Sequence, residues 1–282
     1  MPFAGLRVLS LESRRAKEME ALIRREGGLP FVAPSVQERA LDDPRDSRSE
    51  AILFLERLEA GEFDMVICMT GAGIAFLRDQ VAAHSPIERL SAALQSVTIV
   101  SRGPKPLPIL RELGKRAEIV VPEPNTWKEI VDAVAIRPER RIAVQEYGRP
   151  NEGMTVALEQ LGALVTPIVL YRWELPADIA PLEIAVQRLA AREFDAVLFT
   201  SSIQLDHLMM IARRLNMEVQ VFDTLLNYAA IASVGPVMTA SLEAAGLPAE
   251  IIPVHPKMGA LVKAASEATA AVISRKRRPS PQ

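Results

Sequence analysis

The sequence predicts an α/β protein of two similar lobes, each built on a parallel sheet. The first observation is a repeat: Glu-Phe-Asp at 62–64 returns at 193–195, and Gly-Pro at 103–104 returns at 235–236. The second is a regular alternation of short apolar strands with helices. A repeat distance of 131 to 132 residues matches one small domain. Two similar lobes are expected to enclose a ligand-binding cleft.

Each half of the chain holds four kinds of segment. The first kind is a short apolar strand followed by a helix that ends near glycine. The expected strands and helices of this kind lie at 6–11, 16–26, 141–145 and 155–161. An extended stretch follows each copy, at 31–35 and at 167–172.

The second kind of segment is a helix that leads into an apolar strand. The helices are expected at 51–60 and 182–191, and the strands at 64–69 and 195–200. These strands are apolar throughout, which is typical of a parallel sheet covered by helices on both faces. Small polar residues follow each strand, where the next helix should begin.

The third and fourth kinds complete each half. The third is a strand, then Gly-Pro, then a helix, because proline suits the first helical turn. The fourth is another strand and helix. The third kind is expected to have strands at 98–101 and 230–234 and helices that run to Gly114 and Gly246. The fourth kind is expected to have strands at 118–121 and 250–252 and helices at 126–134 and 258–265. Strand-helix alternation of this kind predicts an open parallel sheet.

Composition and charge exclude several classes of protein. The chain has 282 residues, 49% of them hydrophobic, and a net charge of -2, which argues against a nucleic-acid-binding protein. We identify no signal peptide and no apolar run long enough for a membrane span. The single cysteine, Cys68, fits a reducing compartment and is interpreted as a buried strand thiol.

Metal and nucleotide motifs are also missing from the sequence. The three histidines, His84, His207 and His255, share no metal-ligand spacing with one another or with Cys68. Neither GxGxxG nor a Walker A motif occurs. An enzyme of this sequence is therefore expected to work without a metal or a nucleotide.

Small or hydroxylated residues follow the predicted strands, at the ends where ligands bind in parallel α/β sheets. Helix N-termini there favour anions, although the same residue types are also ordinary helix caps. The candidate substrate-binding residues are Thr70, Gly71, Arg102, Gly103, Lys105, Tyr147, Gly148, Ser201, Ser202, Gly235 and Val237. Several such sites on two lobes indicate a ligand with several carboxylates or phosphates. The cations Arg14, Lys105 and Lys257 either pair with such groups or are simply solvated.

Tyr171 lies in the extended stretch at 168–173, between the two halves. A phenol beside a cleft can donate a proton, which makes Tyr171 the catalytic candidate. The alternative is a tyrosine that packs on a strand between lobes. The basic tail at 274–282 is interpreted as a disordered terminus or as a weak patch for an acidic partner.

Four motifs together resemble the uroporphyrinogen-III synthase family over nearly the whole chain, up to about Ser274. They are Phe-Asp-Ala-Val-Leu-Phe-Thr-Ser-Ser at 194–202, the two Gly-Pro turns, Gly-Ala-Leu-Val at 162–165 and Val-Leu-Tyr-Arg at 169–172. Each motif is degenerate, and their order and spacing together are more specific.

The resemblance implies two flavodoxin-like α/β lobes joined by a two-stranded crossover, with the first lobe discontinuous. Residues 1–36 and 174–282 are then expected to form lobe 1, and residues 37–173 lobe 2. The crossover strands are expected near 31–36 and 167–173. Each lobe would take its first kind of segment from one half of the chain and the other three kinds from the other half.

The resemblance also implies an activity: closure of the linear tetrapyrrole hydroxymethylbilane with inversion of its last ring, through loss of water and a spiro intermediate. It implies no cofactor, a substrate with eight carboxylates held largely by backbone amides, and Tyr171 as proton donor. We further expect a cytoplasmic monomer that receives its substrate from hydroxymethylbilane synthase and binds neither nucleic acid nor membranes.

The sequence departs from the family after each Gly-Pro. The family often has threonine second after this pair, whereas this chain has Pro106 and Met238, with Thr239 one residue late. Hydroxyl roles at these turns are therefore in doubt, while roles of backbone amides remain. A non-catalytic two-lobe sensor, or a degenerate homologue that only binds a tetrapyrrole, stays open as an alternative.

Overall fold

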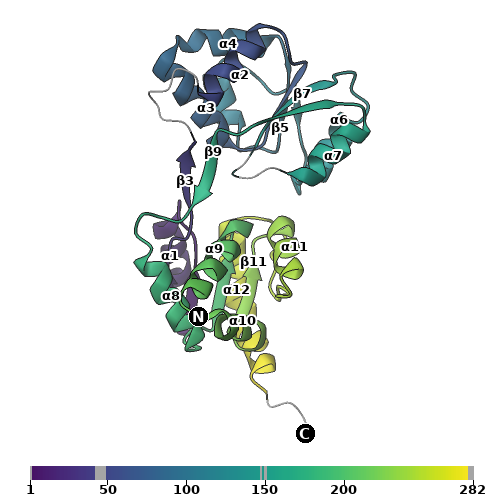
Figure 1. Ribbon diagram of the computed structural model, residues 1–282. Coiled ribbons are helices and arrows are strands. Elements are labelled where there is room, and N and C mark those ends of the chain that lie inside the picture. Colours follow the sequence, from purple (N-terminus) through teal and green to yellow (C-terminus); the bar gives the residue numbers. More distant parts are fainter. Residues whose placement is uncertain (1, 42–48, 147, 149–150, 279–282) are drawn as a thin grey trace. The chain divides into compact units, whose positions relative to one another are not determined.

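The computed structural model describes residues 2–41, 49–146, 148 and 151–278. Two compact units are present: Met1–Gln37 with Glu174–Gln282 form unit 1, and Glu38–Trp173 form unit 2. Each unit is an α/β structure, and the predicted fold class is confirmed. Figure 1 shows the helices and strands of both units.

Unit 2 contains a five-stranded parallel sheet. Its strands, in spatial order, are β6 (Ile119–Val120), β5 (Thr98–Ser101), β4 (Met65–Cys68), β7 (Arg141–Gln145) and β8 (Leu164–Ile168). Its helices are α2 (Glu50–Glu59), α3 (Gly71–His84), α4 (Ile87–Gln95), α5 (Leu107–Glu112), α6 (Trp127–Val134) and α7 (Glu152–Gln160).

Unit 1 repeats this topology. Its sheet has the order β11 (Ala230–Ser233), β10 (Ala196–Phe199), β1 (Arg7–Ser10) and β2 (Leu29–Val32), all parallel. Its helices are α1 (Ala16–Arg25), α8 (Ala180–Ala190), α9 (Ser202–Arg214), α10 (Glu218–Asn227), α11 (Pro236–Ala244) and α12 (Met258–Lys276). The strand expected at 250–252 is reduced to a single bridge between Ala232 and Ile251.

Alternate residues of the strands face opposite layers of helices, as a two-sided sheet requires. In unit 2, Val66 and Cys68 pack with α2 to α5, whereas Met65 and Ile67 pack with α6 and α7. In unit 1, Leu9 and Leu11 pack with α8 to α11, whereas Val8 packs with α1 and α12 on the opposite face. Both faces are covered, so the strands are apolar throughout.

An aspartate at the start of each central strand binds the backbone of a strand from the other half of the chain. Asp64 Oδ2 accepts a hydrogen bond from the Arg141 N–H at 3.1 Å. In the same way, Asp195 Oδ2 accepts from the Arg7 N–H at 2.8 Å. The hydrogen bond from the Arg141 side chain lowers the pKa of Asp64. These contacts lie at the amino ends of the strands, opposite the ends expected to bind ligand.

The expected crossover strand near 31–36 needs correction, whereas the one near 167–173 includes most of β9 (Tyr171–Glu174), although it starts too early. Residues Leu29–Val32 and Leu164–Ile168 are edge strands of the two sheets, and Phe31 packs on Phe194 with ring centroids 5.8 Å apart. The strands β3 (Gln37–Ala40) and β9 (Tyr171–Glu174) pair with each other in a separate two-stranded sheet, at the two points where the chain passes from one unit to the other (Figure 1). An edge strand and a linking strand are both short and extended, so the pattern of residues did not separate them.

Two helix boundaries also differ from expectation. Pro104 does not open a helix: α5 begins at Leu107, because Pro106 disfavours the helical conformation of Lys105, the residue before it. The basic tail is helical as far as Lys276. The Lys276 ammonium lies 2.6 Å from Glu250, and the Arg277 guanidinium lies 2.9 Å from Asp195. Residues 279–282 of the tail lie outside the described residues.

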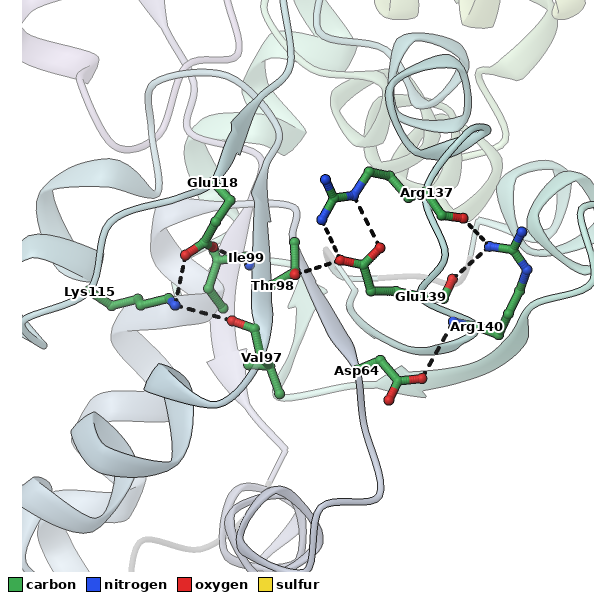
Figure 2. Close-up of polar contacts among 9 residues, drawn as sticks. All are labelled: Asp64, Val97, Thr98, Ile99, Lys115, Glu118, Arg137, Glu139 and Arg140. Carbon is green, nitrogen blue, oxygen red and sulfur yellow. Dashed lines mark hydrogen bonds and ion pairs between the residues drawn. The ribbon is translucent and has the colours of Figure 1, made fainter.

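Figure 2 shows a second polar network at the amino end of the unit 2 sheet. The Lys115 side chain is buried and donates to the Val97 carbonyl at 3.1 Å, and it pairs with Glu118 at 2.9 Å. On the other side of β5, the Thr98 hydroxyl donates to Glu139 at 2.7 Å. Hydrogen bonds from Arg137 and Thr98 lower the pKa of Glu139 to about 2.

Replacing this carboxylate should produce a pH-dependent loss of stability. We expect Glu139→Gln to lower the free energy of unfolding by about 2 kcal/mol at pH 7. The folded state holds the Glu139 pKa below its unfolded value, so the carboxylate stabilises the fold above pH 4.5 and loses this effect as the pH falls towards about 2. The difference between wild type and variant, measured by urea unfolding, should therefore shrink over that range.

Glu159→Gln, at an exposed position on α7, is the matched control and should change little at any pH. An equal loss for Glu139→Gln at pH 3 and at pH 7 would contradict the assignment.

Candidate functional site

Thr70 begins the candidate site of unit 2, at the carboxyl end of β4. It is the N-cap of α3, and its hydroxyl oxygen accepts a hydrogen bond from the Gly73 N–H at 3.0 Å. The side chain is half-buried. A helix of 14 residues directs its positive dipole end towards this position.

Tyr171, the first residue of β9, lies directly beside Thr70. Its hydroxyl oxygen is 3.1 Å from Thr70 Oγ1, and its ring stacks on Phe76 with centroids 5.2 Å apart. The side chain is 0% exposed and belongs to the core of unit 2. The structure thus shows a packed ring with a polar contact at a helix N-terminus, and its role as proton donor stays a prediction.

Gln145 is a residue of this site that the sequence did not reveal. It ends β7, is buried, and its side-chain oxygen accepts from the Thr70 N–H at 3.1 Å. Its amide nitrogen donates to the carbonyl of Glu146. A Cβ atom on Gly73 would lie 2.0 Å from this amide nitrogen, so a side chain there would displace the Gln145 amide. The sequence contained one signal for Gln145 as a site residue: it is a polar residue at the end of an otherwise apolar strand.

The Gly-Pro turn after β5 approaches the same helix N-terminus. The Ser101 hydroxyl donates to the Gly103 carbonyl at 2.7 Å, and Gly103 has φ +74°. A Cβ atom on Gly71 would lie 2.5 Å from the Lys105 carbonyl oxygen, so the turn and the start of α3 are in close contact. Arg102 follows β5, and its N–H donates to the Cys68 carbonyl at 3.0 Å. The structure therefore brings together Thr70, Gly71, Arg102, Gly103 and Lys105.

Two further candidates of unit 2 follow β7. Gly148 forms a parallel bridge with Arg172 and has φ +79°. A Cβ atom there would lie 2.4 Å from the Trp173 ring, which explains the glycine. Tyr147 lies outside the described residues.

In unit 1, the corresponding helix N-terminus is that of α9, after β10. The N–H groups of Thr200 and Ser201 donate to the side-chain oxygen of Gln204, at 2.8 and 3.3 Å. The Thr200 hydroxyl donates to Glu12, at the end of β1, at 2.6 Å. Ser202 is buried. A carboxylate, Glu12, therefore lies at an edge where the sequence predicted only groups that favour anions.

The Gly-Pro turn of unit 1 repeats that of unit 2. The Ser233 hydroxyl donates to the Gly235 carbonyl at 3.1 Å. Thr239 Oγ1 lies 2.9 Å from Ser233 Oγ, so this hydroxyl is used inside the turn, and Met238 is buried. In unit 2, Pro106 is buried as well. The side chains second after Gly-Pro thus contribute to packing rather than to an exposed surface.

The remaining candidates of unit 1 have exposed side chains. Val237 lies in the first turn of α11, and Lys257 is the N-cap of α12. Arg14 lies between β1 and α1. In unit 2, the Lys105 side chain is also exposed. These cations have the solvent access that pairing with an external carboxylate requires.

Cys68 is confirmed as a buried strand thiol. Its side chain is 1% exposed, and burial raises its pKa to about 12. The thiol therefore stays protonated at neutral pH. Across the described part of the chain, no three His, Cys, Asp or Glu side chains gather as a metal site would need. None of the described helices is long and apolar enough to cross a membrane.

The family model described as "Uroporphyrinogen-III synthase HemD" matches residues 17–263 of the chain. An uncharacterized protein of Bacillus subtilis, YjjA, is 27% identical over 262 residues, which is 92% of this chain and 94% of the relative. A putative uroporphyrinogen-III synthase of Methanothermobacter thermautotrophicus is 27% identical over 237 residues, covering 83% and 87% of the two chains.

Among solved structures, a mutant uroporphyrinogen III synthase of the extremely thermophilic bacterium Thermus thermophilus is similar with a TM-score of 0.67. The match covers 96% of this chain and 98% of that one at 21% sequence identity. The enzyme from Helicobacter pylori matches with a TM-score of 0.51 at 13% identity, over 92% and 98% of the two chains. Both likenesses show the fold.

The Gly-Pro turn offers a test of how tightly the unit 2 site is packed. A Cβ atom on Gly103 would lie 2.5 Å from Asn125 Oδ1, whereas one on Gly114 would meet nothing within 4 Å. Both glycines have positive φ, so each change to alanine costs about 1 to 2 kcal/mol for the left-handed backbone. We expect Gly103→Ala to cost at least about 1 kcal/mol more in urea unfolding than Gly114→Ala.

Asn125→Gly in the Gly103→Ala background removes the obstructing side chain and should recover this extra loss. Equal losses for the two single variants would show that the turn is not constrained by the loop at 121–126.

Proposed function

The chain belongs to the uroporphyrinogen-III synthase family, and we propose that it converts hydroxymethylbilane to uroporphyrinogen III without a cofactor. The match of the family model to residues 17–263 is the observation that carries this proposal. The family acts in porphyrin and heme biosynthesis. Within this proposal the protein is a cytoplasmic monomer that receives hydroxymethylbilane from its synthase.

The chemistry of the strand ends supports a polycarboxylate substrate. Exposed cations flank the carboxyl ends of the strands in both units: Arg14 and Lys257 in unit 1, and Lys105 in unit 2. The N-termini of α3 and α9 lie at the same ends, and their dipoles favour anions. In this proposal the half-buried backbone at Gly71 and Gly148 lies close to the substrate, whereas the buried Gly103 and Gly235 shape the turns beside it.

Tyr171 is the proposed source of the proton for the departing hydroxyl. Because its side chain is fully buried, we place the half-buried Thr70 hydroxyl between the phenol and the substrate. Tyr171 gives its proton to Thr70 Oγ1, 3.1 Å away, while Thr70 gives its own proton to the leaving hydroxyl, which departs as water. The positive end of α3 stabilises the phenolate that remains.

The substrate then completes the reaction. Loss of water leaves a protonated, cationic azafulvene, and the substituted carbon of the last ring attacks it to form the spiro intermediate. This intermediate fragments and recloses with the ring inverted, and the proton lost in rearomatisation returns to the Tyr171 phenolate through Thr70. The protein's main task is to hold the substrate in the folded conformation that favours this attack.

A binding protein without catalysis is the second candidate. It is favoured by the Thr239 hydroxyl, which is used inside its own turn, and by Pro106, which is buried where the family often has threonine. Such a protein would bind the tetrapyrrole product and leave the isomer ratio of uncatalysed closure unchanged.

The decisive experiment is an isomer assay with freshly made hydroxymethylbilane. After oxidation, chromatography separates the type I and type III porphyrins, and we expect type III to dominate. Buffer alone supplies the uncatalysed ratio. Formation of the type I isomer alone, together with tight binding of uroporphyrinogen III in calorimetry, would contradict the catalytic proposal and support a binding protein without catalysis.

The same assay tests the path of the proton. We expect Tyr171→Phe and Thr70→Val each to lower kcat at least several-fold, and the double variant to be no slower than the worse single one, since both lie on one path. Thr70→Ser, which keeps the hydroxyl, should retain most of the activity. Full activity of Tyr171→Phe would remove the phenol from the mechanism.

A further inference from the structure

Each unit uses one glutamine amide to hold the backbone that follows its central strand. In unit 1 this is Gln204, in the first turn of α9, which accepts from the N–H groups of Thr200 and Ser201. In unit 2 it is Gln145, at the end of β7, which accepts from the Thr70 N–H. The same contact is therefore made by residues of different elements.

The two glutamines occupy different positions of the repeat, and each has a residue other than glutamine as its counterpart in the other unit. Gly73 lies 131 residues before Gln204, so glycine occupies the helix position in unit 2. Gln145 is paired with Cys68 on the adjacent strand. Continuing the unit 1 register, in which Ser10 pairs with Leu198, puts Leu11 at the equivalent place. Unit 1 thus has the pair Leu11 and Gln204, and unit 2 has the pair Gln145 and Gly73.

The volume available beside the helix explains why the two residues of the unit 2 pair occur together. The Gln145 amide fills the volume beside Gly73, where a Cβ atom would be 2.0 Å away. In unit 1, the Gln204 amide instead donates to the Leu11 carbonyl at 3.2 Å. The glutamine on the strand therefore occupies the space that a side chain at Gly73 would need, whereas the glutamine on the helix bonds the main chain of Leu11 and is compatible with its apolar side chain.

The two arrangements also differ in which neighbouring hydroxyl is involved and in which partner it meets. In unit 1, the Gln204 amide nitrogen donates to the hydroxyl of Thr200, whose counterpart in the repeat is Met69, and that hydroxyl donates to Glu12. In unit 2, the Gln145 nitrogen is directed to the Glu146 carbonyl, and the hydroxyl of Thr70, the counterpart of Ser201, lies against Tyr171.

We propose that Gln145 is a positioning residue for Tyr171, acting through the backbone of Thr70. The Gln145 amide fixes the Thr70 N–H, and the Thr70 hydroxyl, held by the Gly73 N–H, then sets the place of the phenol. Gly73 is part of the same device because it makes room for the amide. The effect on catalysis rests on the proposed function, whereas the effect on the Tyr171 environment does not.

The experiment compares Gln145→Leu, Gly73→Gln and the double variant that restores the unit 1 pair. Each single change should lower the urea midpoint, the first by leaving the Thr70 N–H without its acceptor and the second by displacing the Gln145 amide. The double variant should recover at least half of the combined loss, because its new glutamine can hold the Thr70 N–H from the helix. If the urea midpoint of the double variant falls by the sum of the two single losses, the unit 1 pair cannot replace the unit 2 pair and this part of the inference is overturned.

The positioning role has its own readout. The chain has three tyrosines, so the ¹³Cζ resonance of Tyr171 is assigned by its loss in Tyr171→Phe. In Gln145→Leu we expect this resonance to shift and the Thr70 amide to exchange at least tenfold faster. If Gln145→Leu does not fold, Gly73→Ala displaces the same amide and should give the same two changes. An unshifted resonance in a folded variant would overturn the proposal.

Activity separates this inference from the proposed function. If the wild type forms type III product, Gln145→Leu should lower kcat several-fold, by no more than Tyr171→Phe does, with a smaller change in KM. If the wild type forms only type I product while the Tyr171 resonance still responds to Gln145→Leu, the proposed function fails and the positioning role stands.

Discussion

Two carboxylates, Asp64 and Asp195, join strands that come from opposite halves of the chain. Each lies just before a central strand and accepts the N–H of the first residue of a neighbouring strand, Arg141 or Arg7. Because these contacts set where the paired strands start, they also set where the strands end. The residues at the carboxyl ends, including Gln145 beside Cys68, therefore come into register from a contact at the opposite edge.

One topology has produced two different sites. Both units hold the turn after the central strand with a glutamine and use a serine hydroxyl, Ser101 or Ser233, inside the Gly-Pro turn. They differ in the group placed next to the helix N-terminus: a carboxylate, Glu12, in unit 1 and a phenol, Tyr171, in unit 2. The scaffold is thus symmetric, whereas its chemistry is not.

The sequence predicted the elements well where local pattern decides them. The apolar strands, the glycine stops and the buried Cys68 follow from composition and spacing alone. It did not predict features that depend on distant partners: Lys276 is helical beside Glu250, and Gln145 meets Thr70 across 75 residues. Tyr171 was located as a candidate, but its burial depends on Phe76 and on the core of unit 2, which no local pattern contains.

The pairing of β1 with β10 has a consequence for biosynthesis. The Arg7 N–H and its acceptor Asp195 are 188 residues apart, so at 5 to 20 residues per second the ribosome releases β1 about 10 to 40 s before its partner strand exists. During that interval the apolar faces of β1 and β2 have no sheet to join, whereas all strands of the unit 2 sheet emerge first. Nascent chains therefore pass through a stage in which every strand of the unit 2 sheet is available for pairing while the apolar faces of β1 and β2 are still uncovered.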